Sequence, residues 1–269
     1  MHTMQYDREY PNQWQDVLVK FREGYRSPVA DFHEHDYYEL NLILSGNVNV
    51  LLENQANEGV QSRIVLTKPH TPHFVTCKPD TLYSRLYLLF AEDFIANYVS
   101  EWPQLSKLFG DGGRVVTLSP EQRDFCKNII RRVESETNQM RQKLLILYLL
   151  SYIGEYIDQT TTPSATPTYI LDALSYIEEH YHEKITAADL AMRLYVGRTT
   201  LMTAFKQYTG NTLNNYVTEC RLKNAIEMLS HGYTEQETAE ACGLGDSSGL
   251  IRSFKRIFGV TPRQYIPRN

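Results

Sequence analysis

The sequence predicts an α+β protein of two domains, a β-barrel with attached helices followed by an all-helical part with two helix-turn-helix units. Three observations support this fold class: short strand-like runs before about residue 90, a Thr- and Pro-rich stretch at residues 160–168, and an internal repeat in roughly the last hundred residues. A chain of 269 residues suits two modest domains better than one. We therefore expect a first domain over residues 1–159, a linker over 160–168 and a second domain over 169–269.

The composition is that of an ordinary folded protein. A formal net charge of -5, with 42% hydrophobic and 22% charged residues, excludes a disordered chain and a strongly basic coat protein. The four cysteines stand far apart and form no Cys-x-x-Cys pair, so we expect buried thiols in a reducing compartment. The first residues lack the apolar core of a signal peptide, and no apolar run approaches the roughly 20 residues that span a bilayer. These features predict a cytoplasmic protein without a membrane partner.

Strand-like segments dominate the chain before about residue 90. They are short runs rich in Leu, Ile, Val and Tyr, and each is bounded by Gly, Pro, Asn or Asp. Four such runs are Glu39–Leu44, Val48–Leu52, Ile64–Leu66 and Tyr83–Leu89. Short strands at these intervals are typical of a sandwich or a barrel.

Helical patterns replace the strands over about residues 119–159. Ser119 is expected to cap a first helix, with Pro120 at the first helical position and Gln122 completing a capping box. A second helix is expected over roughly Gln139–Ile157, with a wide apolar side. That side comprises Leu144, Leu145, Leu147, Tyr148, Ser151 and Tyr152. It either packs against the barrel or forms a dimer interface, and the spacing does not separate these two alternatives.

An internal repeat is the strongest feature of the second domain. A shift of 49 residues, which moves Phe205 onto Phe254, superimposes six identical residues. The first copy contains Leu201, Phe205, Lys206, Gly210, Thr212 and Tyr216, and the second contains Leu250, Phe254, Lys255, Gly259, Thr261 and Tyr265. Two copies are too few for a solenoid, so the repeat predicts one supersecondary unit built twice.

Each copy has the pattern of a helix, a turn and a second helix. The expected segments are Ala187–Leu194, Tyr195–Gly197 and Arg198–Tyr208 in the first copy, and Thr234–Ala241, Gly243–Gly245 and Asp246–Phe258 in the second. A short Gly-containing turn between two short helices is the signature of a helix-turn-helix unit. One long helix, expected over Asn211–Leu229, has an apolar stripe that can support both units. Two recognition helices on such a support could enter successive major grooves about 34 Å apart.

These segments resemble the DNA-binding domain of the AraC/XylS transcription regulators. The resemblance rests on Ile185–Ala191, Phe205–Gly210, Arg221–Ala225 and Gly259–Tyr265, and it covers about the last hundred residues. It implies binding to double-stranded promoter DNA and, often, recruitment of RNA polymerase. It places the base-reading residues at Thr199, Met202 and Thr203 in the first recognition helix and at Ser247, Ser248 and Arg252 in the second. The other expected DNA contacts are Arg198, Thr200, Lys206, Lys255 and Arg256.

The chemistry of these side chains divides them into two roles. A guanidinium can pair with guanine through two hydrogen bonds, so Arg252 is the best candidate for a base reader. Lys206, Lys255 and Arg256 are better suited to phosphate, where they add affinity that depends on salt. The first recognition helix has weak base readers and is expected to contribute mainly affinity.

Two departures from the family pattern concern glycines. Gly249, followed by Leu250, stands where the family often has an aromatic pair, and glycine within a helix costs roughly 1 kcal/mol relative to alanine. This predicts a looser second recognition helix. Gly197 and Gly245 are expected to take the cap positions of the two recognition helices, where Ser is more common.

The first domain contains His33-x-His35-x-x-x-Glu39, followed by His73, in a pattern that resembles the two signature boxes of the cupin barrel. In cupin enzymes these positions bind a divalent metal, and three imidazoles with a carboxylate suit iron, manganese, nickel or zinc. Sensor domains of the AraC family share this cupin-like barrel and often keep His-x-His without a metal. The resemblance therefore favours an effector pocket without a cofactor. The expected lining residues are His33, His35, Tyr37, Glu39 and His73.

These observations predict a transcription regulator, not an enzyme, that is controlled by a small-molecule effector and acts as a homodimer. The resemblance implies a sugar or a related metabolite more often than a lipid. One alternative is a cupin metalloenzyme or metal-dependent sensor with an appended helical domain, which leaves the 49-residue repeat unexplained. Another is a constitutive DNA-binding protein whose barrel only dimerises.

Overall fold

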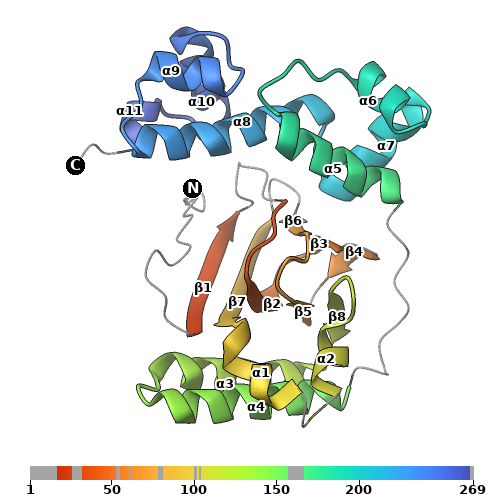
Figure 1. Ribbon diagram of the computed structural model, residues 1–269, viewed down its shortest axis with the longest axis vertical. Helices are drawn as coiled ribbons and strands as arrows, with labels where there is room; N and C mark the ends of the chain where they lie inside the picture. The colour runs from red at the N-terminus through yellow and green to blue at the C-terminus, as the bar shows by residue number, and fades with distance from the viewer. Residues whose placement is uncertain are drawn as a thin grey trace. The chain divides into compact units, whose positions relative to one another are not determined.

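The computed structural model describes residues 17–25, 32–52, 55–60, 62–77, 81–99, 102, 104–156 and 167–266. These residues form two compact units, one within His33–Thr166 together with the first strand, and one within Pro167–Asn269 (Figure 1). Most of the expected linker, residues 160–166, lies outside the described residues. Thr168, which the sequence suggested as the end of the linker, already begins helix α5 (Thr168–His180).

The first unit is built on two antiparallel sheets. A five-stranded sheet has the order β1-β7-β2-β5-β8, and a three-stranded sheet has the order β4-β3-β6. The strands are β1 (Val17–Tyr25), β2 (Tyr37–Ser45), β3 (Val48–Leu52), β4 (Gln55–Val60), β5 (Arg63–Thr67), β6 (His73–Cys77), β7 (Leu82–Ala91) and β8 (Arg114–Thr117). Both sheets contribute to one apolar cluster, which comprises Ile43, Val48, Val50, Leu52, Val65, Cys77, Tyr83 and Val115. This shared interior confirms the predicted β-rich class of the first domain.

Alternation along β2 sends successive side chains to the two faces of the five-stranded sheet. Leu40 lies opposite Leu66 of β5 and Leu88 of β7, and all three are buried beneath the helices. Ile43 belongs to the cluster between the sheets, so Glu39, which has the same parity, also faces that interior. One strand therefore supplies both the core and the polar site described below.

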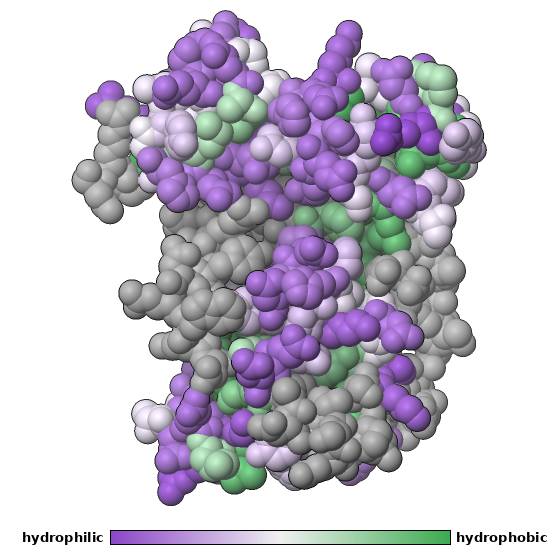
Figure 2. All heavy atoms as spheres, viewed as in Figure 1, coloured by the Kyte–Doolittle hydropathy of each residue, from purple (hydrophilic) through white to green (hydrophobic). Residues whose placement is uncertain are grey.

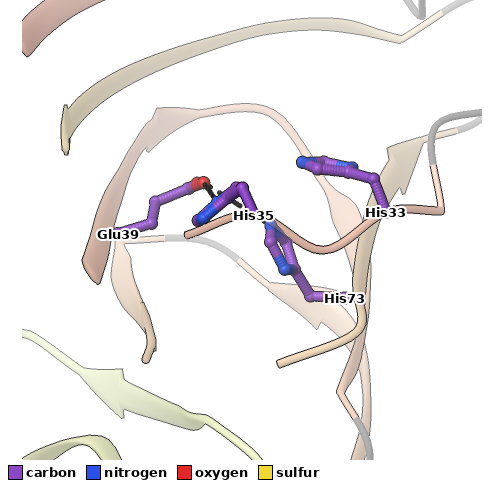
Figure 3. A group of neighbouring side chains, drawn as sticks. All are labelled: His33, His35, Glu39 and His73. Atoms are coloured by element: carbon purple, nitrogen blue, oxygen red, sulfur yellow. Dashed lines mark hydrogen bonds and ion pairs between the residues drawn. The ribbon is translucent and has the colours of Figure 1, made fainter. Parts of the chain in front are cut away.

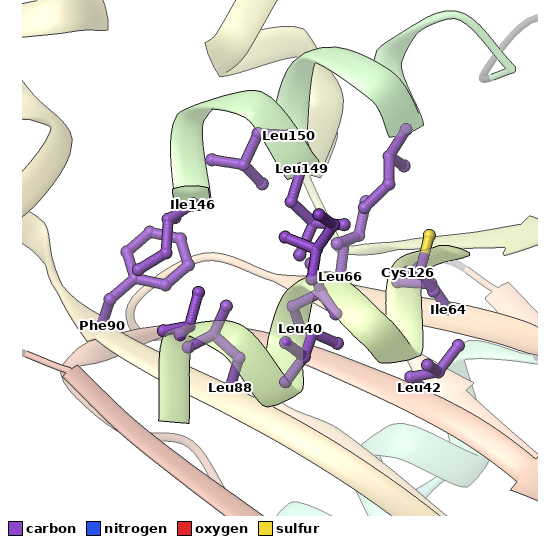
Figure 4. Close-up of a cluster of buried hydrophobic side chains, with 14 of the residues drawn as sticks. Leu40, Leu42, Ile64, Leu66, Leu88, Phe90, Cys126, Ile146, Leu149 and Leu150 are labelled. Carbon is purple, nitrogen blue, oxygen red and sulfur yellow. The ribbon is translucent and has the colours of Figure 1, made fainter. Parts of the chain in front are cut away.

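Helices cover the outer face of the five-stranded sheet. They are α1 (Glu92–Val99), α2 (Gln104–Phe109), α3 (Pro120–Ser135) and α4 (Gln139–Gly154). Figure 4 shows the buried cluster in which side chains of the sheet, such as Leu40 and Leu88, meet Ile146 and Leu149 of α4. The capping box predicted at the start of α3 is confirmed, because the Ser119 hydroxyl accepts from the Gln122 backbone while the Gln122 side chain accepts from Ser119.

The predicted apolar side of the second helix is partly wrong. The buried residues of α4 are Ile146, Leu149, Leu150 and Ile153, whose spacing defines one helical face. Leu144 and Tyr148 point to solvent together with Met140, at relative exposures of 57%, 54% and 60%. The predicted set contains none of the four buried residues, because most of the helix is apolar around its circumference and the pattern does not mark one face. Leu145, Leu147 and Tyr152 of that set are partly buried and pack against the core.

The second unit is all-helical, as predicted. Its remaining helices are α6 (Ala187–Arg193), α7 (Arg198–Thr209), α8 (Leu213–Ser230), α9 (Glu235–Ala241), α10 (Ser247–Phe258) and α11 (Pro262–Tyr265). The long helix α8 contacts α5 and α7 as well as α9 and α10, so it supports both halves of the unit (Figure 1). It begins later than predicted, because Thr212 caps it and the Asn211 side chain instead donates to Glu219.

All four cysteines are buried, as predicted. Among the helices of the described segments, none is long and apolar enough to cross a membrane.

Candidate nucleic-acid interface and sensor site

The internal repeat is visible as repeated geometry. Phe205 packs its ring edge-on against Tyr216 with centroids 5.4 Å apart, and Phe254 packs in the same way against Tyr265 at 5.5 Å. Gly210 and Gly259 end the two recognition helices α7 and α10 with φ angles of 70° and 75°. In each copy the capping amide bonds back to a lysine carbonyl, which satisfies one of the open carbonyls of the last turn. The two copies are therefore the same unit in structure as well as in sequence.

The turns between the paired helices are also equivalent. The amide of Val196 donates to the Ala191 carbonyl at 3.0 Å, and the amide of Leu244 donates to the Ala239 carbonyl at 2.8 Å. A left-handed residue occurs in each turn, Tyr195 with φ 55° in the first and Gly243 with φ 67° in the second, where Gly245 is left-handed as well with φ 85°. A Cβ on Gly243 would lie 2.3 Å from the His182 carbonyl oxygen, so close backbone approach requires glycine in the second turn.

The outer face of α7 presents the predicted contact residues. Leu201, Phe205 and Thr209 are buried on the opposite face and anchor the helix to its unit. The exposed residues are Arg198, Thr199, Thr200, Met202, Thr203 and Lys206. This arrangement leaves one cationic and hydroxyl-rich side of the helix accessible to a partner.

The outer face of α10 is more basic. Leu250 and Phe254 are buried, while Ser248, Arg252, Lys255 and Arg256 are exposed. The two cations of the last turn also complement the negative end of the helix dipole. Much of the described surface of the second unit is hydrophilic on the face shown in Figure 2.

Two details of the second recognition helix differ from the sequence-based expectation. Asp246, not Gly245, caps α10, and its carboxylate accepts from the Gly249 amide at 2.7 Å. Ser247 is half-buried, and its hydroxyl donates to Gln236 of α9 at 2.9 Å. Gln236 is not expected as a partner from the sequence, because nothing in its spacing indicates a contact eleven residues away.

Tyr195, which the sequence indicates only as a turn residue, is a further candidate for contact with a partner. Its side chain is 96% exposed and lies three residues before α7. Its left-handed backbone conformation is uncommon for a bulky residue. An exposed aromatic ring in this position can contact a partner of the recognition helix.

The predicted loosening of α10 by Gly249 does not follow from its environment. A Cβ at this position would lie 2.2 Å from the Leu244 carbonyl oxygen of the preceding turn. Glycine therefore allows a close approach between the turn and the recognition helix. Glycine lowers the stability of the helix itself, but a larger residue would not fit against the turn. The sequence pattern could not reveal this contact.

Gly249→Ala is expected to lower the free energy of unfolding of the second unit by about 1–3 kcal/mol, because the added methyl group overpacks against the turn. Urea unfolding followed by circular dichroism measures the change. Gly154→Ala, at the end of α4 in the first unit, is a control for the glycine-to-alanine change itself, since nothing lies within 4 Å of its added Cβ. Equal stability of the two variants would contradict the close approach at Gly249.

The predicted sensor residues come together in the first unit. His33, His35, Glu39 and His73 each offer one ligand atom, and these four atoms all lie within 4.8 Å of one another (Figure 3). His33 and His73 are joined by two backbone hydrogen bonds of 3.1 and 2.9 Å, which bring the segment before β2 against the start of β6. The spacing in the sequence thus corresponds to one cluster in space.

Burial and hydrogen bonding define the electrostatics of the cluster. Burial opposes ionisation of the Glu39 carboxyl, but the imidazoles of His35 and His73, whose Nε2 atoms lie 3.0 and 3.5 Å from Oε2, outweigh it and hold its pKa well below the usual range. The Asn41 amide donates to the other carboxylate oxygen at 3.0 Å. Tyr37 takes part through its backbone carbonyl, which lies 3.1 Å from His35 Nδ1. Burial, and to a smaller extent the negative charge of Asp36, raises the pKa of the Tyr37 phenol.

In comparisons with known proteins, each unit matches the model of a protein family. The AraC-like ligand binding domain matches residues 17–150, and a helix-turn-helix domain matches residues 190–268. The HTH-type transcriptional regulator YisR of Bacillus subtilis (strain 168) is 25% identical over 246 residues, which cover 85% of each chain. The HTH-type transcriptional activator RhaS of Escherichia coli O81 (strain ED1a) is 24% identical over 255 residues, which cover 88% of each chain.

Among solved structures, ToxT from Vibrio cholerae aligns over 94% of this chain and 98% of its own, with 15% identity and a TM-score of 0.40. The two family matches and the relatives confirm the resemblance that the repeat and the front motif indicated. The chain belongs to the AraC family of transcription regulators and combines a ligand-binding domain with a DNA-binding helix-turn-helix domain.

Proposed function

We propose that this regulator reads promoter DNA with α7 and α10, which enter successive major grooves, and that an effector bound in the first unit controls transcription. The observation that carries the proposal is the repeat, because both copies bury the same apolar positions and expose the opposite helical face. A rigid common helix, α8, suits such paired recognition. One chain then reads two groove segments.

The exposed side chains of the two helices suit different kinds of contact with DNA. On α10, Arg252 reads a base, because its planar guanidinium can donate twice to guanine. Lys206, Lys255 and Arg256 contact phosphates and position the helices. The first helix offers threonines and Met202, which suit phosphate contacts and a thymine methyl group. Base specificity therefore comes mainly from α10, and both helices contribute to the affinity for DNA.

The effector is proposed to be a small polar metabolite of the sugar class. The support is the polar interior of the first unit, where buried His35, Glu39, Asn41 and His73 face one another between apolar sheets. Buried polar groups of this kind orient a ligand that carries several hydroxyl groups. A thermal-shift screen with sugars tests this class, because a ligand of the folded state raises the melting temperature.

A homodimer is proposed through α4. Met140, Leu144 and Tyr148 recur at every fourth position and form an exposed apolar stripe on this helix. Such a stripe is suited to an antiparallel or parallel contact with a second copy. The resemblance to the family further supports RNA polymerase as a partner and the cytoplasm as the location.

A fragment of residues 169–269 is expected to fold and to bind promoter DNA without the first unit, because its core is contained within its own helices. Circular dichroism and titration of a fluorescent promoter duplex measure these two properties. Full-length protein on the same duplex is the reference. A fragment with the spectrum of an unfolded chain would contradict the proposal that the second unit is the autonomous reader.

A further inference from the structure

We propose that the second unit associates head to tail with the second unit of another copy of this chain. In this contact Tyr195, in the turn of the first helix-turn-helix copy, enters a cavity between α8 and α9 of the neighbouring chain. The proposal goes beyond the regulatory function above, because the contact involves neither DNA, nor the effector, nor the apolar stripe of α4. It rests on two surfaces, on their charges and on the internal repeat.

The first surface is the Tyr195 patch, which comprises Met192, Arg193, Tyr195 and Arg198. Tyr195 is 96% exposed and Met192 is 71% exposed, and both arginines are exposed as well. Tyrosine, methionine and arginine are the residue types enriched in protein interfaces. A left-handed backbone with φ 55° is costly for a tyrosine, and residues in such conformations cluster at binding sites. The patch therefore has the composition of a docking surface.

The second surface is an open cavity of about 820 Å³, which we call the α8–α9 cavity. Its lining includes Met228 and the aromatic residues Tyr181 and Tyr233, together with the acidic residues Glu227 and Glu237. None of the described residues that line it is a lysine or an arginine. Pockets of about 300–1,000 Å³ hold ligands of drug size, so this cavity has room for a tyrosine side chain.

Hydrogen bonds hold the groups around the cavity in place. The Glu237 carboxylate accepts from the Thr234 amide at 2.9 Å and from its hydroxyl at 2.7 Å. These bonds lower the pKa of Glu237, so its side chain stays charged at neutral pH. The Tyr233 amide donates to the Met228 carbonyl at 3.2 Å, which fixes the turn between α8 and α9. A cavity with a fixed wall loses less conformational entropy when it is filled.

The two surfaces carry opposite charges. Arg193 and Arg198 flank Tyr195 in the sequence, whereas Glu227 and Glu237 line the cavity. Opposite charges around a contact steer association and fix its register. Two Tyr195 patches that faced each other would instead place arginines against arginines. Charge therefore favours patch against cavity over a symmetric contact.

The internal repeat contains a related contact. Gly243 takes the turn position of Tyr195 in the second copy, because the amides of the next residues, Val196 and Leu244, form equivalent hydrogen bonds. A Cβ on Gly243 would lie 2.3 Å from the His182 carbonyl oxygen, so the connection after α5 covers that turn. In the described part of the second unit, the side chain of Tyr195 has no such cover. A head-to-tail contact covers the first turn from outside the chain.

The patch and the cavity belong to different halves of the second unit. Figure 1 shows α6 and α7, which flank Tyr195, at the other end of the unit from α9. One unit can therefore contact two neighbours at once through two different surfaces. Such a contact is heterologous, and it joins chains in a row in which every second unit has the same direction.

Photo-crosslinking locates the contact. Full-length protein with p-benzoylphenylalanine in place of Tyr195 is mixed with wild-type protein labelled with heavy nitrogen, and promoter DNA is added to a parallel sample. We expect crosslinks between chains that join position 195 to the segment from Glu227 to Glu237, identified by mass spectrometry. Crosslinks that stay within one chain, that reach only DNA or another segment, or that do not form would each overturn the proposal.

Sedimentation velocity of the full-length protein measures the association. Tyr195→Gly removes the ring and suits the left-handed backbone, and it is expected to weaken association about tenfold or more, as loss of a central aromatic anchor does. Tyr195→Phe keeps the ring and should retain most of the affinity. Because every sample retains α4, differences between the samples report the contact of the second units. Circular dichroism confirms the fold of each variant.

A charge exchange tests the pairing of the two surfaces. Arg193→Glu and Glu227→Arg each place like charges against each other, so each variant alone is expected to associate about tenfold more weakly. An equimolar mixture of the two should associate like the wild-type protein, because each patch then meets a cavity of opposite charge. Glu240→Arg is the matched control, since Glu240 is exposed on α9 and does not line the cavity. A mixture that stays as weak as its components, or unchanged association of Tyr195→Gly, would refute the contact.

Discussion

Phe254→Ala is expected to lower the free energy of unfolding of the second unit by about 3–5 kcal/mol. Phe254 is fully buried, and its ring packs against Phe258 at 4.6 Å and Tyr265 at 5.5 Å. Truncation removes these contacts and leaves a cavity below the exposed side of α10. A loss of this size is a large part of the 5–15 kcal/mol that stabilises a typical domain, so DNA binding should fail well below the normal melting temperature.

Phe205→Ala tests whether the two helix-turn-helix units share this behaviour. Phe205 is the repeat partner of Phe254, is equally buried and contacts Tyr216 at 5.4 Å. Urea unfolding of both variants should show losses of similar size in one transition, because α8 contacts the recognition helix of each copy. A loss of less than about 1 kcal/mol for either variant would mean that its ring is not a structural anchor.

Arg252→Ala is expected to remove sequence specificity. If Arg252 pairs with guanine, binding to the cognate duplex should weaken by about 1–3 kcal/mol, with a much smaller loss on random DNA. The preference at that base pair should relax. Its exposed position on α10, opposite buried Leu250 and Phe254, allows the side chain to reach a major groove. Titration of cognate and scrambled duplexes at several salt concentrations measures both effects.

Lys255→Ala is the matched control for Arg252→Ala. Lys255 is exposed in the last turn of the same helix. As a phosphate contact, it should weaken binding to both duplexes alike and make the salt slope shallower by about 1. Equal losses on cognate and random DNA for Arg252→Ala would show instead that Arg252 contacts only the backbone.

The two units differ in how far local sequence predicts them. The helices of the second unit begin and end within a few residues of their predicted bounds. Local chemistry explains this, since Thr234 caps α9 with a capping box and Gly259 ends α10 in the left-handed region. Such signals act over four or five residues and need no knowledge of the partner.

In the first unit, only four of the eight described strands were predicted: β2, β3, β5 and β7. These strands are rich in buried aliphatic residues. The strand β1 carries Lys20, Arg22 and Glu23, and β8 has only four residues, so neither shows a clear alternation. Both lie at the edges of the five-stranded sheet, and they are recognised as strands only through pairing with β7 and β5.

By itself, the sequence determined that this chain is a two-domain AraC-type regulator. The 49-residue repeat, the helix caps and the histidine motif are all visible in the order of residues along the chain. Tertiary structure alone decided which side of α4 is buried, why Gly249 must be glycine and how the ring nitrogens near Glu39 are oriented. Each of these depends on groups that meet only after folding: the sheet beneath α4, the Leu244 carbonyl and the carbonyls that hold the histidines. Periodicity and spacing place residues on a face, but distances between elements determine what that face contacts.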